Sequence, residues 1–424
     1  MEKSRKPKIR FKGYNDDWEQ RELGEIADFY TGNGLSWNDI SENGSQECIL
    51  YGNLYTDYGM IAENVVYRTN TVINTPVYSE FGDVLIPASD TTPTGLARAT
   101  SIEKSGVLLG GDINIVRPKK SISGSYLSLA INRNKGELIK LIKGTTVRHI
   151  HNSEIKGVTV SLPNNLCEQE IITECFRNLD NLITLHQRKL EKLMNVKKSM
   201  LEKMFPKQGS TVPEIRFNGF TQAWEQREFS EMFDCTISNN TLSRSELSYE
   251  EGSILNIHYG DILIKYGSIL DIHKYKIPRI PNEKKEDFRG SLLQPGDIVI
   301  ADTAEDETTG KACEIGNLFG NSIVAGLHTM VARPNIEMAS GYLGYYLNSN
   351  AYHCQLLPMM QGIKVLSLSR ANVKKTALKF PESTKEQQLI ANYFIQLDEL
   401  ITLHQRKLEK LKNIKKSMLE KMFI

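Results

Sequence analysis

Two long stretches of the chain have the hydrophobic pattern of an amphipathic α-helix. Residues 168–205 and 385–423 contain neither Gly nor Pro, are rich in strong helix formers, and place apolar residues at intervals of three and four. His186 and Lys197 interrupt the apolar track of the first stretch, and His404 lies at the matching place in the second. The pattern predicts two helices that pair as a coiled coil, with polar residues that set the register of the seam.

The rest of the sequence has the short apolar runs that are typical of β-strands. Residues 84–86, 113–116 and 262–264 are three such runs, and Gly, Asn, Asp and Pro separate runs of this kind. A helix is expected to interrupt each β-rich region, over residues 125–141 in the first and 340–356 in the second. Each region is therefore predicted to be an α+β domain.

The chain is also an internal duplication. Residues 182–205 recur as residues 400–423 with two substitutions. The segment Trp-Glu-Gln-Arg-Glu occupies residues 18–22 and recurs at residues 224–228, and a Pro-x-Ile-Arg-Phe-x-Gly motif precedes both copies. Between these anchors the copies diverge. This indicates one repeated framework that carries two different variable modules.

These anchors divide the chain into six predicted parts. Pro206 is expected to end the first long helix, and a short polar linker follows it. The predicted parts are a lead-in segment at residues 1–22, a first variable domain at 23–166, a helix at 167–206, a linker with the second lead-in segment at 207–228, a second variable domain at 229–384, and a helix at 385–424.

Composition excludes several classes of protein. The chain has 424 residues, of which 40% are hydrophobic and 24% are charged, as in a globular protein of two or more domains. No apolar run is long enough to span a bilayer, and the six cysteines form no Cys-x-x-Cys pair. We therefore expect a reduced, cytoplasmic protein without a structural zinc site.

The net charge of +1 conceals two basic segments. Residues 182–205 contain six Lys or Arg and two Glu, and residues 400–423 contain seven Lys or Arg and two Glu. The remainder of the chain is net acidic. Such basic helical faces are either solvated surfaces of a coiled coil or contacts for nucleic acid or an acidic partner, and the sequence leaves both readings open.

Polar loops recur at matching places in the two copies. One loop follows the apolar run at residues 84–86 and its counterpart follows residues 298–300, while a second pair lies at residues 143–149 and 361–367. Short polar side chains mixed with Arg and Lys suit contacts with phosphates and base edges. The candidate DNA-binding residues are Ser89, Thr91, Thr92, Arg98, Lys143, Thr145, Thr146, Arg148, His149, Thr303, Thr308, Thr309, Lys311, Gln361, Lys364, Ser367 and Arg370.

Signatures of catalysis are largely missing from the sequence. It contains no phosphate-binding loop and no Asn/Asp-Pro-Pro-aromatic motif of amino-methylating DNA methyltransferases, and its histidines lack metal-ligand spacing. Asp271 followed by Glu283-Lys284-Lys285 resembles part of a metal-dependent nuclease site, but residues 282–287 have the composition of a charged surface loop. The sequence therefore predicts no catalytic residue and no metal site.

Together these features resemble the specificity subunit of type I restriction–modification systems. The resemblance rests on the paired lead-in segments, the paired Gly-Asp-hydrophobic strands at residues 82–86 and 296–300, and two helices that end in Met-Leu-Glu-Lys-Met-Phe. It covers essentially the whole chain. It implies an α+β fold with two tandem target-recognition domains, each followed by a long helix. The helices would pair as an antiparallel coiled coil with pseudo-two-fold symmetry.

The resemblance also implies a function. Each domain would read one half of a bipartite, asymmetric target in double-stranded DNA, and the chain would direct methyltransferase and endonuclease subunits without being an enzyme itself. No cofactor is expected in this chain, because S-adenosylmethionine, ATP and Mg²⁺ would bind to the partner subunits. The expected partners are duplex DNA, two modification subunits and the restriction subunits, with no membrane. A coiled-coil scaffold without sequence-specific DNA contact and a metal-dependent nuclease remain as alternatives.

Overall fold

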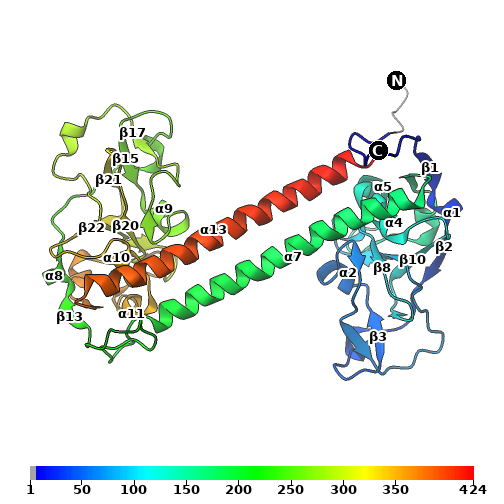
Figure 1. Cartoon of the computed structure of the whole chain (residues 1–424), viewed down its shortest axis with the longest axis horizontal. Helices are drawn as coiled ribbons and strands as arrows, with labels where there is room; N and C mark the ends of the chain where they lie inside the picture. The colour runs from blue at the N-terminus through cyan, green and yellow to red at the C-terminus, as the bar shows by residue number, and fades with distance from the viewer. Residues whose placement is uncertain (1–5) are drawn as a thin grey trace. The chain divides into compact units, whose positions relative to one another are not determined.

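The computed structural model describes residues 6–424, which form two compact units (Figure 1). Unit 1 consists of Met1–Gln187 with Arg406–Ile424, and unit 2 consists of Arg188–Gln405. Each unit contains an α+β domain and one part of both long helices. The predicted fold class is confirmed.

The long helices are α7 (Leu166–Lys203) and α13 (Thr384–Lys421), each of 38 residues, drawn in green and in orange to red in Figure 1. In unit 1 the Lys415 ammonium lies 2.5 Å from the Asp180 carboxylate, and in unit 2 Lys197 lies 2.5 Å from Asp398. The contacts advance along α7 as they recede along α13, so the helices are antiparallel. The predicted pairing is confirmed, and Lys197 interrupts the apolar track because it forms one of these ion pairs.

A five-stranded sheet of the same topology lies at the centre of each unit. The sheet of unit 1 has the order β2-β10-β6-β8-β4, and that of unit 2 has the order β14-β22-β18-β20-β16. In both sheets the last pair is parallel and the others are antiparallel. The strands are β2 (Ala27–Thr31), β4 (Ile61–Ala62), β6 (Asp83–Pro87), β8 (Thr100–Ile102) and β10 (Ile113–Pro118), then β14 (Phe233–Asp234), β16 (Ile269–Leu270), β18 (Ile298–Ala301), β20 (Ala312–Ile315) and β22 (Thr329–Pro334).

Smaller sheets complete each unit, and one of them explains the repeated lead-in segment. Strand β1 (Glu19–Glu22) pairs with β12 (Thr159–Leu162), and β13 (Glu225–Glu228) pairs with β24 (Ala377–Phe380). The Glu-Gln-Arg-Glu segment therefore joins the beginning of each domain to the strand that precedes its long helix. The three-stranded sheets are β5 (Tyr67–Thr69), β3 (Gln46–Ile49) and β9 (Leu108–Leu109), and β17 (Arg279–Ile280), β15 (Ile254–Ile257) and β21 (Ser322–Ala325).

The helices predicted inside the two domains are each divided into two. Residues 125–141 contain α4 (Gly124–Arg133) and α5 (Lys135–Leu141), which meet at Asn134. Residues 340–356 contain α10 (Tyr342–Leu347) and α11 (Asn350–His353). The other short helices are α1 (Leu23–Ile26), α2 (Asn53–Thr56), α3 (Pro93–Leu96), α6 (Asn152–Ile155), α8 (Phe229–Met232) and α12 (Arg370–Val373), with 3₁₀ turns at Trp37–Asp39, Arg244–Glu246, Lys285–Phe288 and Leu357–Met359.

The strand predicted at residues 262–264 is wrong, because these residues lie in helix α9 (Tyr259–Ile264). Three consecutive apolar residues do not distinguish a helix from a strand. His258 begins the helix, and its Nδ1 accepts the Gly260 N–H at 3.2 Å. Ile262 is buried whereas Ile264 is 80% exposed, and two residues apart on a strand would have shared one face.

The aromatic core of each unit contains the residue that follows a long helix. Phe205, just beyond the end of α7, stacks on Phe394 in unit 2 with ring centroids 5.9 Å apart. Phe423, just beyond the end of α13, stacks on Tyr126 in unit 1 at 5.4 Å. Both phenylalanines are buried, so the repeated Met-Phe at the end of each copy is a core element.

A second repeated device ties each lead-in segment to a helix. The Arg10 guanidinium donates two hydrogen bonds to Glu168, at 2.6 and 2.9 Å, and Arg216 donates two to Glu386, at 2.7 and 2.8 Å. Both glutamates are buried, so removing either arginine would leave an uncompensated carboxylate.

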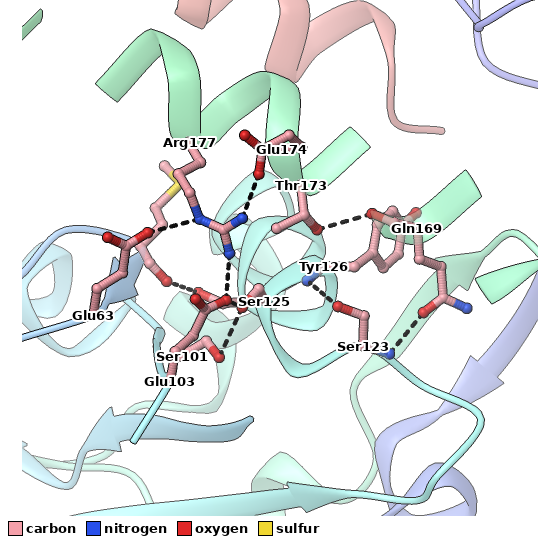
Figure 2. A network of polar contacts seen from close by, with 12 residues as sticks. Glu63, Ser101, Glu103, Ser123, Ser125, Tyr126, Gln169, Thr173, Glu174 and Arg177 are labelled. Carbon is pink, nitrogen blue, oxygen red and sulfur yellow. Dashed lines mark hydrogen bonds and ion pairs between the residues drawn. The ribbon is translucent and has the colours of Figure 1, made fainter. Parts of the chain in front are cut away.

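The contact between the long helix and its domain differs between the two units. Phe176 of α7 and Phe394 of α13 are equivalent, and the residue that follows each of them makes a different contact. In unit 1, Arg177 of α7 forms ion pairs with Glu63 at 2.8 Å and with Glu103 and Glu174 at 2.5 Å. Ser125 of α4 also donates to Glu103, at 2.7 Å (Figure 2). This polar network links α7 to α4 and to the end of β8.

In unit 2 the corresponding position of α13 is Ile395, which packs against the apolar core. A buried carboxylate lies nearby, because Glu314 of β20 accepts the N–H groups of Gly341 at 2.5 Å and Gly344 at 2.9 Å at the start of α10. Burial raises the pKa of Glu314 from its ordinary value of 4.5 to about 7, and the two N–H groups oppose that rise.

Candidate nucleic-acid interface

The two predicted polar loops of unit 1 lie side by side. Strand β7 (Ser89–Asp90) pairs antiparallel with β11 (Arg148–His149), so that Ser89 is opposite His149. This short ladder joins residues 89–98 to residues 143–149. We call these two segments the first loop pair.

The two predicted loops of unit 2 meet in the same way. Strand β19 (Thr303–Ala304) pairs antiparallel with β23 (Leu366–Ser367), and Thr303 is opposite Ser367. Residues 302–311 and 361–367 therefore form the second loop pair. Loops far apart in the sequence are thus brought together at the same place in both units.

A tight hairpin forms the second segment of each loop pair. Lys143 and His149 exchange backbone hydrogen bonds of 3.0 and 2.8 Å, and Gln361 and Ser367 exchange bonds of the same lengths. The first turn residue is glycine with a positive φ in both hairpins, and a Cβ atom there would lie 2.3 Å or less from a carbonyl oxygen across the turn. Both hairpins therefore require glycine.

Most predicted residues on the hairpins are exposed. The exposed candidates of both loop pairs are Thr91, Thr92, Lys143, Thr145, Thr146, His149, Thr308, Gln361, Lys364 and Ser367. The hairpin tips also carry apolar side chains, since Ile363 is fully exposed and Val147 and Val365 are half exposed. These tips combine donors, acceptors and apolar groups, which suits contact with base edges and thymine methyl groups.

Three predicted cations are engaged with backbone carbonyl groups instead. Arg98 donates to the Leu54 carbonyl at 2.5 Å, Lys311 donates to that of Leu263 at 2.9 Å, and Arg370 donates to that of Cys235 at 2.8 Å. Burial also lowers the pKa of Lys311. In this conformation the three side chains hold neighbouring segments together.

The other predicted residues organise the loops from within. Ser89 and Thr309 are buried, and Thr92 caps α3 by accepting the Gly95 N–H at 3.2 Å. Thr303 bonds to Asp302, and Thr308 bonds to Asp306. The Arg148 Nε atom is buried and has no hydrogen-bond partner among residues 6–424. Lys143 lies 3.0 Å from Glu154 and, as the largest cause, lowers the pKa of that carboxyl to about 2.

The two loop pairs differ in charge. The first segment of unit 1 contains Asp90 and Arg98, and its hairpin contains Lys143 and Arg148. The first segment of unit 2 is acidic, and Lys364 is the exposed cation of its hairpin. The acidic residues are Asp302, Glu305, Asp306 and Glu307. Phosphate contact is therefore better supported on the unit 1 side than along residues 302–311.

Sequence reasoning missed residues that border both loop pairs. The Tyr55 O–H donates to the Ser89 carbonyl at 2.7 Å, and the Tyr259 ring lies 5.3 Å from that of His328, whose Nδ1 lies 3.4 Å from the Thr303 hydroxyl. A Tyr-Gly pair recurs at residues 51–52 and 259–260. This repeat was the available signal for Tyr259, but only the fold places Tyr259 beside the loops, and Tyr55 and His328 lie outside the repeat.

The nuclease-like residues do not form a recognisable site. Asp271 accepts the His273 N–H at 2.9 Å in a turn, and Glu283 and Lys284 are exposed. Across residues 6–424, no group of three or more His, Cys, Asp or Glu side chains is arranged to hold a metal ion. Within the same residues, no helix has the length and apolar character needed to cross a membrane.

Comparison with known proteins identifies the family. The family described as "Type I restriction modification DNA specificity domain" matches residues 15–195 and residues 222–413, one copy in each half. The chain therefore belongs to the type I restriction–modification DNA specificity family. Its function is to supply DNA sequence specificity within such a system.

Individual relatives agree with this assignment over nearly the whole length. The type I restriction enzyme MjaVIII specificity subunit of Methanocaldococcus jannaschii is 22% identical over 416 residues, covering 95% of this chain and 91% of that protein. The crystal structure of the S subunit from M. genitalium matches with a TM-score of 0.57 at 15% identity, over 99% of both chains. A chain from a structural study of type I complex assembly matches with a TM-score of 0.51 at 13% identity, over 96% of this chain and 98% of that one.

Proposed function

We propose that each unit reads one half of an asymmetric bipartite target in double-stranded DNA and that the chain directs partner methyltransferase and endonuclease subunits to it. The observation that carries this proposal is a repeated frame around divergent surfaces. The Arg10–Glu168 and Arg216–Glu386 bonds match, whereas Thr145 and Thr146 of the first hairpin are replaced by Ile363 and Lys364 in the second. Equal frames would present each reader in the same way, and different surfaces would select different bases.

The direct test is to sequence methylated bases in cells with and without this gene. Replacing residues 28–162 with the equivalent residues of a relative should change one half of the methylated motif and keep the other half. A matched replacement within residues 234–380 should change the other half alone. Motifs in which both halves change together, or neither does, would contradict the assignment of one unit to one half-site.

We further propose that the chain is not an enzyme. S-adenosylmethionine, ATP and Mg²⁺ would bind to the partner subunits, which accounts for the missing phosphate loop and methyltransferase motif in this sequence. The purified chain incubated with DNA and all three cofactors should leave the DNA unmethylated and uncut. Turnover that survives complete removal of the partners would contradict this.

The proposed stoichiometry is two methyltransferase subunits for each chain. The repeated helix segment exposes the same leucine pair once in each unit, Leu182 with Leu185 in unit 1 and Leu400 with Leu403 in unit 2. Exposed apolar side chains at equivalent places would offer two equal docking points to two copies of one partner. Changing one pair to serine should reduce the bound methyltransferase from two copies to one in native mass spectrometry. Variants of either pair that still bind two copies would contradict the proposal.

We also assign the chain to the cytoplasm, where its DNA target would lie. All six cysteines are free thiols in the structure, as a reducing compartment would maintain them. Fractionation of cells that express the chain should recover it with the cytoplasmic proteins and DNA.

A further inference from the structure

A residue of left-handed backbone conformation adjoins each loop pair. Asp112 has a φ of 58° and His328 has a φ of 54°, and each immediately precedes the strand that pairs with the centre of the main sheet, β10 in unit 1 and β22 in unit 2. The Asp112 carbonyl accepts the Ala88 N–H at 2.7 Å, and the His328 carbonyl accepts the Asp302 N–H at 3.1 Å. The two residues therefore occupy the same position in the repeated frame.

The side chains at this turn contact the loop pairs directly. Asp112 Oδ2 accepts the Ser89 hydroxyl at 2.9 Å. His328 Nδ1 lies 3.4 Å from the Thr303 hydroxyl and 3.4 Å from the Asp302 carboxylate. Both side chains remain exposed to solvent, although each is held at one atom. These contacts engage Oδ2 of Asp112 and Nδ1 of His328, and they do not involve Oδ1 of Asp112 or Nε2 of His328.

The backbone restricts which residues can occupy this position. A positive φ is unfavourable for most side chains, and Asn, Asp, His and Gly are the residues that tolerate it best. These four differ in hydrogen-bonding capacity, since Asp only accepts, Asn accepts and donates, His does either according to its protonation, and Gly does neither. The turn thus favours a few residue types that differ sharply in recognition chemistry.

We propose that this turn is a base-reading position in each unit, and that Asp112 accepts a hydrogen bond from the exocyclic amino group of a cytosine or an adenine in the major groove. The inference rests on the proposed function of the units as DNA readers. A carboxylate near DNA is repelled by phosphates and is favourable where a base amino group donates to it. Unit 2 has an imidazole in place of this carboxylate, so the two half-sites differ at the equivalent base pair.

The test uses the full chain with its methyltransferase partners and maps the methylated motif in cells. Asp112→Asn keeps an oxygen that can accept from Ser89 and keeps a residue that tolerates a positive φ, so the fold should be maintained. We expect one position in one half of the motif to relax, with discrimination reduced about 5- to 100-fold. The other half should stay unchanged and reports that the complex is assembled.

The reciprocal variant and its control are in unit 2. His328→Asp should alter one position in the other half of the motif. Asn282→Asp is the matched control, because Asn282 is exposed, has a φ of 61° and gains the same carboxylate outside the second loop pair. The control should leave both halves of the motif unchanged.

Duplexes that lack one amino group test the atomic contact. At the position identified for Asp112, cytosine or adenine is replaced by an analogue without its exocyclic amino group. Binding by the parent complex should weaken about 10-fold or more, and the Asp112→Ala complex should lose little further affinity. An unchanged motif in both Asp112→Asn and His328→Asp, or equal sensitivity of the parent and Asp112→Ala to the analogue, would overturn the inference. A parent chain that directs no methylation would instead overturn the proposed function itself.

Discussion

The two units join their domains to their long helices at equivalent places with different chemistry. Unit 1 uses the charged network around Arg177, whereas unit 2 places Ile395 in an apolar contact and accommodates the buried carboxylate of Glu314 a short distance away. The hydrogen bonds from Arg10 to Glu168 and from Arg216 to Glu386 match in the two units, and so do the stacked rings of Phe423 and Phe205. The difference shows which contacts define the frame. The hydrogen bonds between arginine and glutamate at the lead-in segments are the same in both units. The contact made by Arg177 in unit 1 is ionic, and the contact made by Ile395 in unit 2 is apolar.

The largest expected effect tests what the units share. Phe205→Ala should destabilise unit 2, and Phe423→Ala should destabilise unit 1, each by about 3–5 kcal/mol, because each deletes a buried aromatic ring. Hydrogen exchange measured separately in the two central sheets would report the loss. Phe319→Ala is the control, since Phe319 is 60% exposed and should change little. Loss of protection in the wrong unit would contradict the shared core arrangement.

The next effect separates the units by pH. Ser101 of β8 and Glu314 of β20 occupy equivalent positions, because Ser101 pairs with Val84 of β6 and Glu314 pairs with Ile298 of β18. Unit 2 therefore has a titratable group where unit 1 has a serine, and burial raises the pKa of Glu314 from 4.5 to about 7. Between these pH values the unfolded chain releases this proton while the folded unit keeps it. Unit 2 should therefore lose about 3 kcal/mol of stability as the pH rises from 4.5 to 7 and change little through this group above that range.

Glu314→Gln tests that pH dependence directly. Glutamine does not ionise and keeps one carbonyl oxygen, which can accept the Gly341 or the Gly344 N–H, so the decrease between pH 4.5 and 7 should disappear from unit 2. Hydrogen exchange of α10 at several pH values, corrected for the intrinsic exchange rate, would measure it. A slope that persists in Glu314→Gln would assign the effect to another group.

A smaller effect sharpens the contrast between charged and apolar contact. Arg177→Ala should destabilise unit 1 by about 1–3 kcal/mol, because Glu103 is left largely buried and without its cation. Ile395→Ala should cost unit 2 about 1–2 kcal/mol through lost packing. The free energy lost on Arg177→Ala should change with salt between about 0.05 and 0.5 M, whereas the free energy lost on Ile395→Ala should not. Equal salt dependence in thermal unfolding would erase the distinction.

The smallest effect tests the symmetry of the helix pair. Lys197 and Lys415 each form one partly exposed ion pair, at 2.5 Å, with an aspartate of the other long helix. Replacing either lysine by alanine should cost about 0.5–1 kcal/mol, with the same value in the two units. A double-mutant cycle with Asp398 and with Asp180 measures each pair. Clearly unequal coupling energies would show that the two halves of the helix pair differ.

The sequence predicted the frame better than it predicted the domain interiors. Helical periodicity over dozens of residues and a near-identical repeat constrain α7 and α13 strongly, and both helices were predicted within a few residues. The apolar run at residues 262–264 is too short to reveal its period, and the cap provided by His258 decided in favour of a helix. Local patterns therefore predict long elements, whereas short ones depend on contacts that a sequence does not display.

The candidate site was predictable as a set of loops but not as a surface. The recurrence of polar segments pointed to both loop pairs, yet the ladders β7–β11 and β19–β23 that unite them connect residues more than fifty positions apart. The engagement of Arg98 with a carbonyl group, and the position of Asp112 beside Ser89, follow from the tertiary fold. Residue type alone gives neither. The predicted DNA contacts themselves remain predictions.

The position of Phe423 sets an order in which the units can be completed during synthesis. Unit 2 is one continuous segment, Arg188–Gln405, so every residue of its core is available before the last part of the chain is made. Unit 1 begins first but needs Arg406–Ile424, whose phenylalanine packs on Trp18 and Tyr126. At about 5–20 residues per second, the ribosome supplies that ring tens of seconds after the rest of unit 1. The first domain to emerge is therefore the last to close its core.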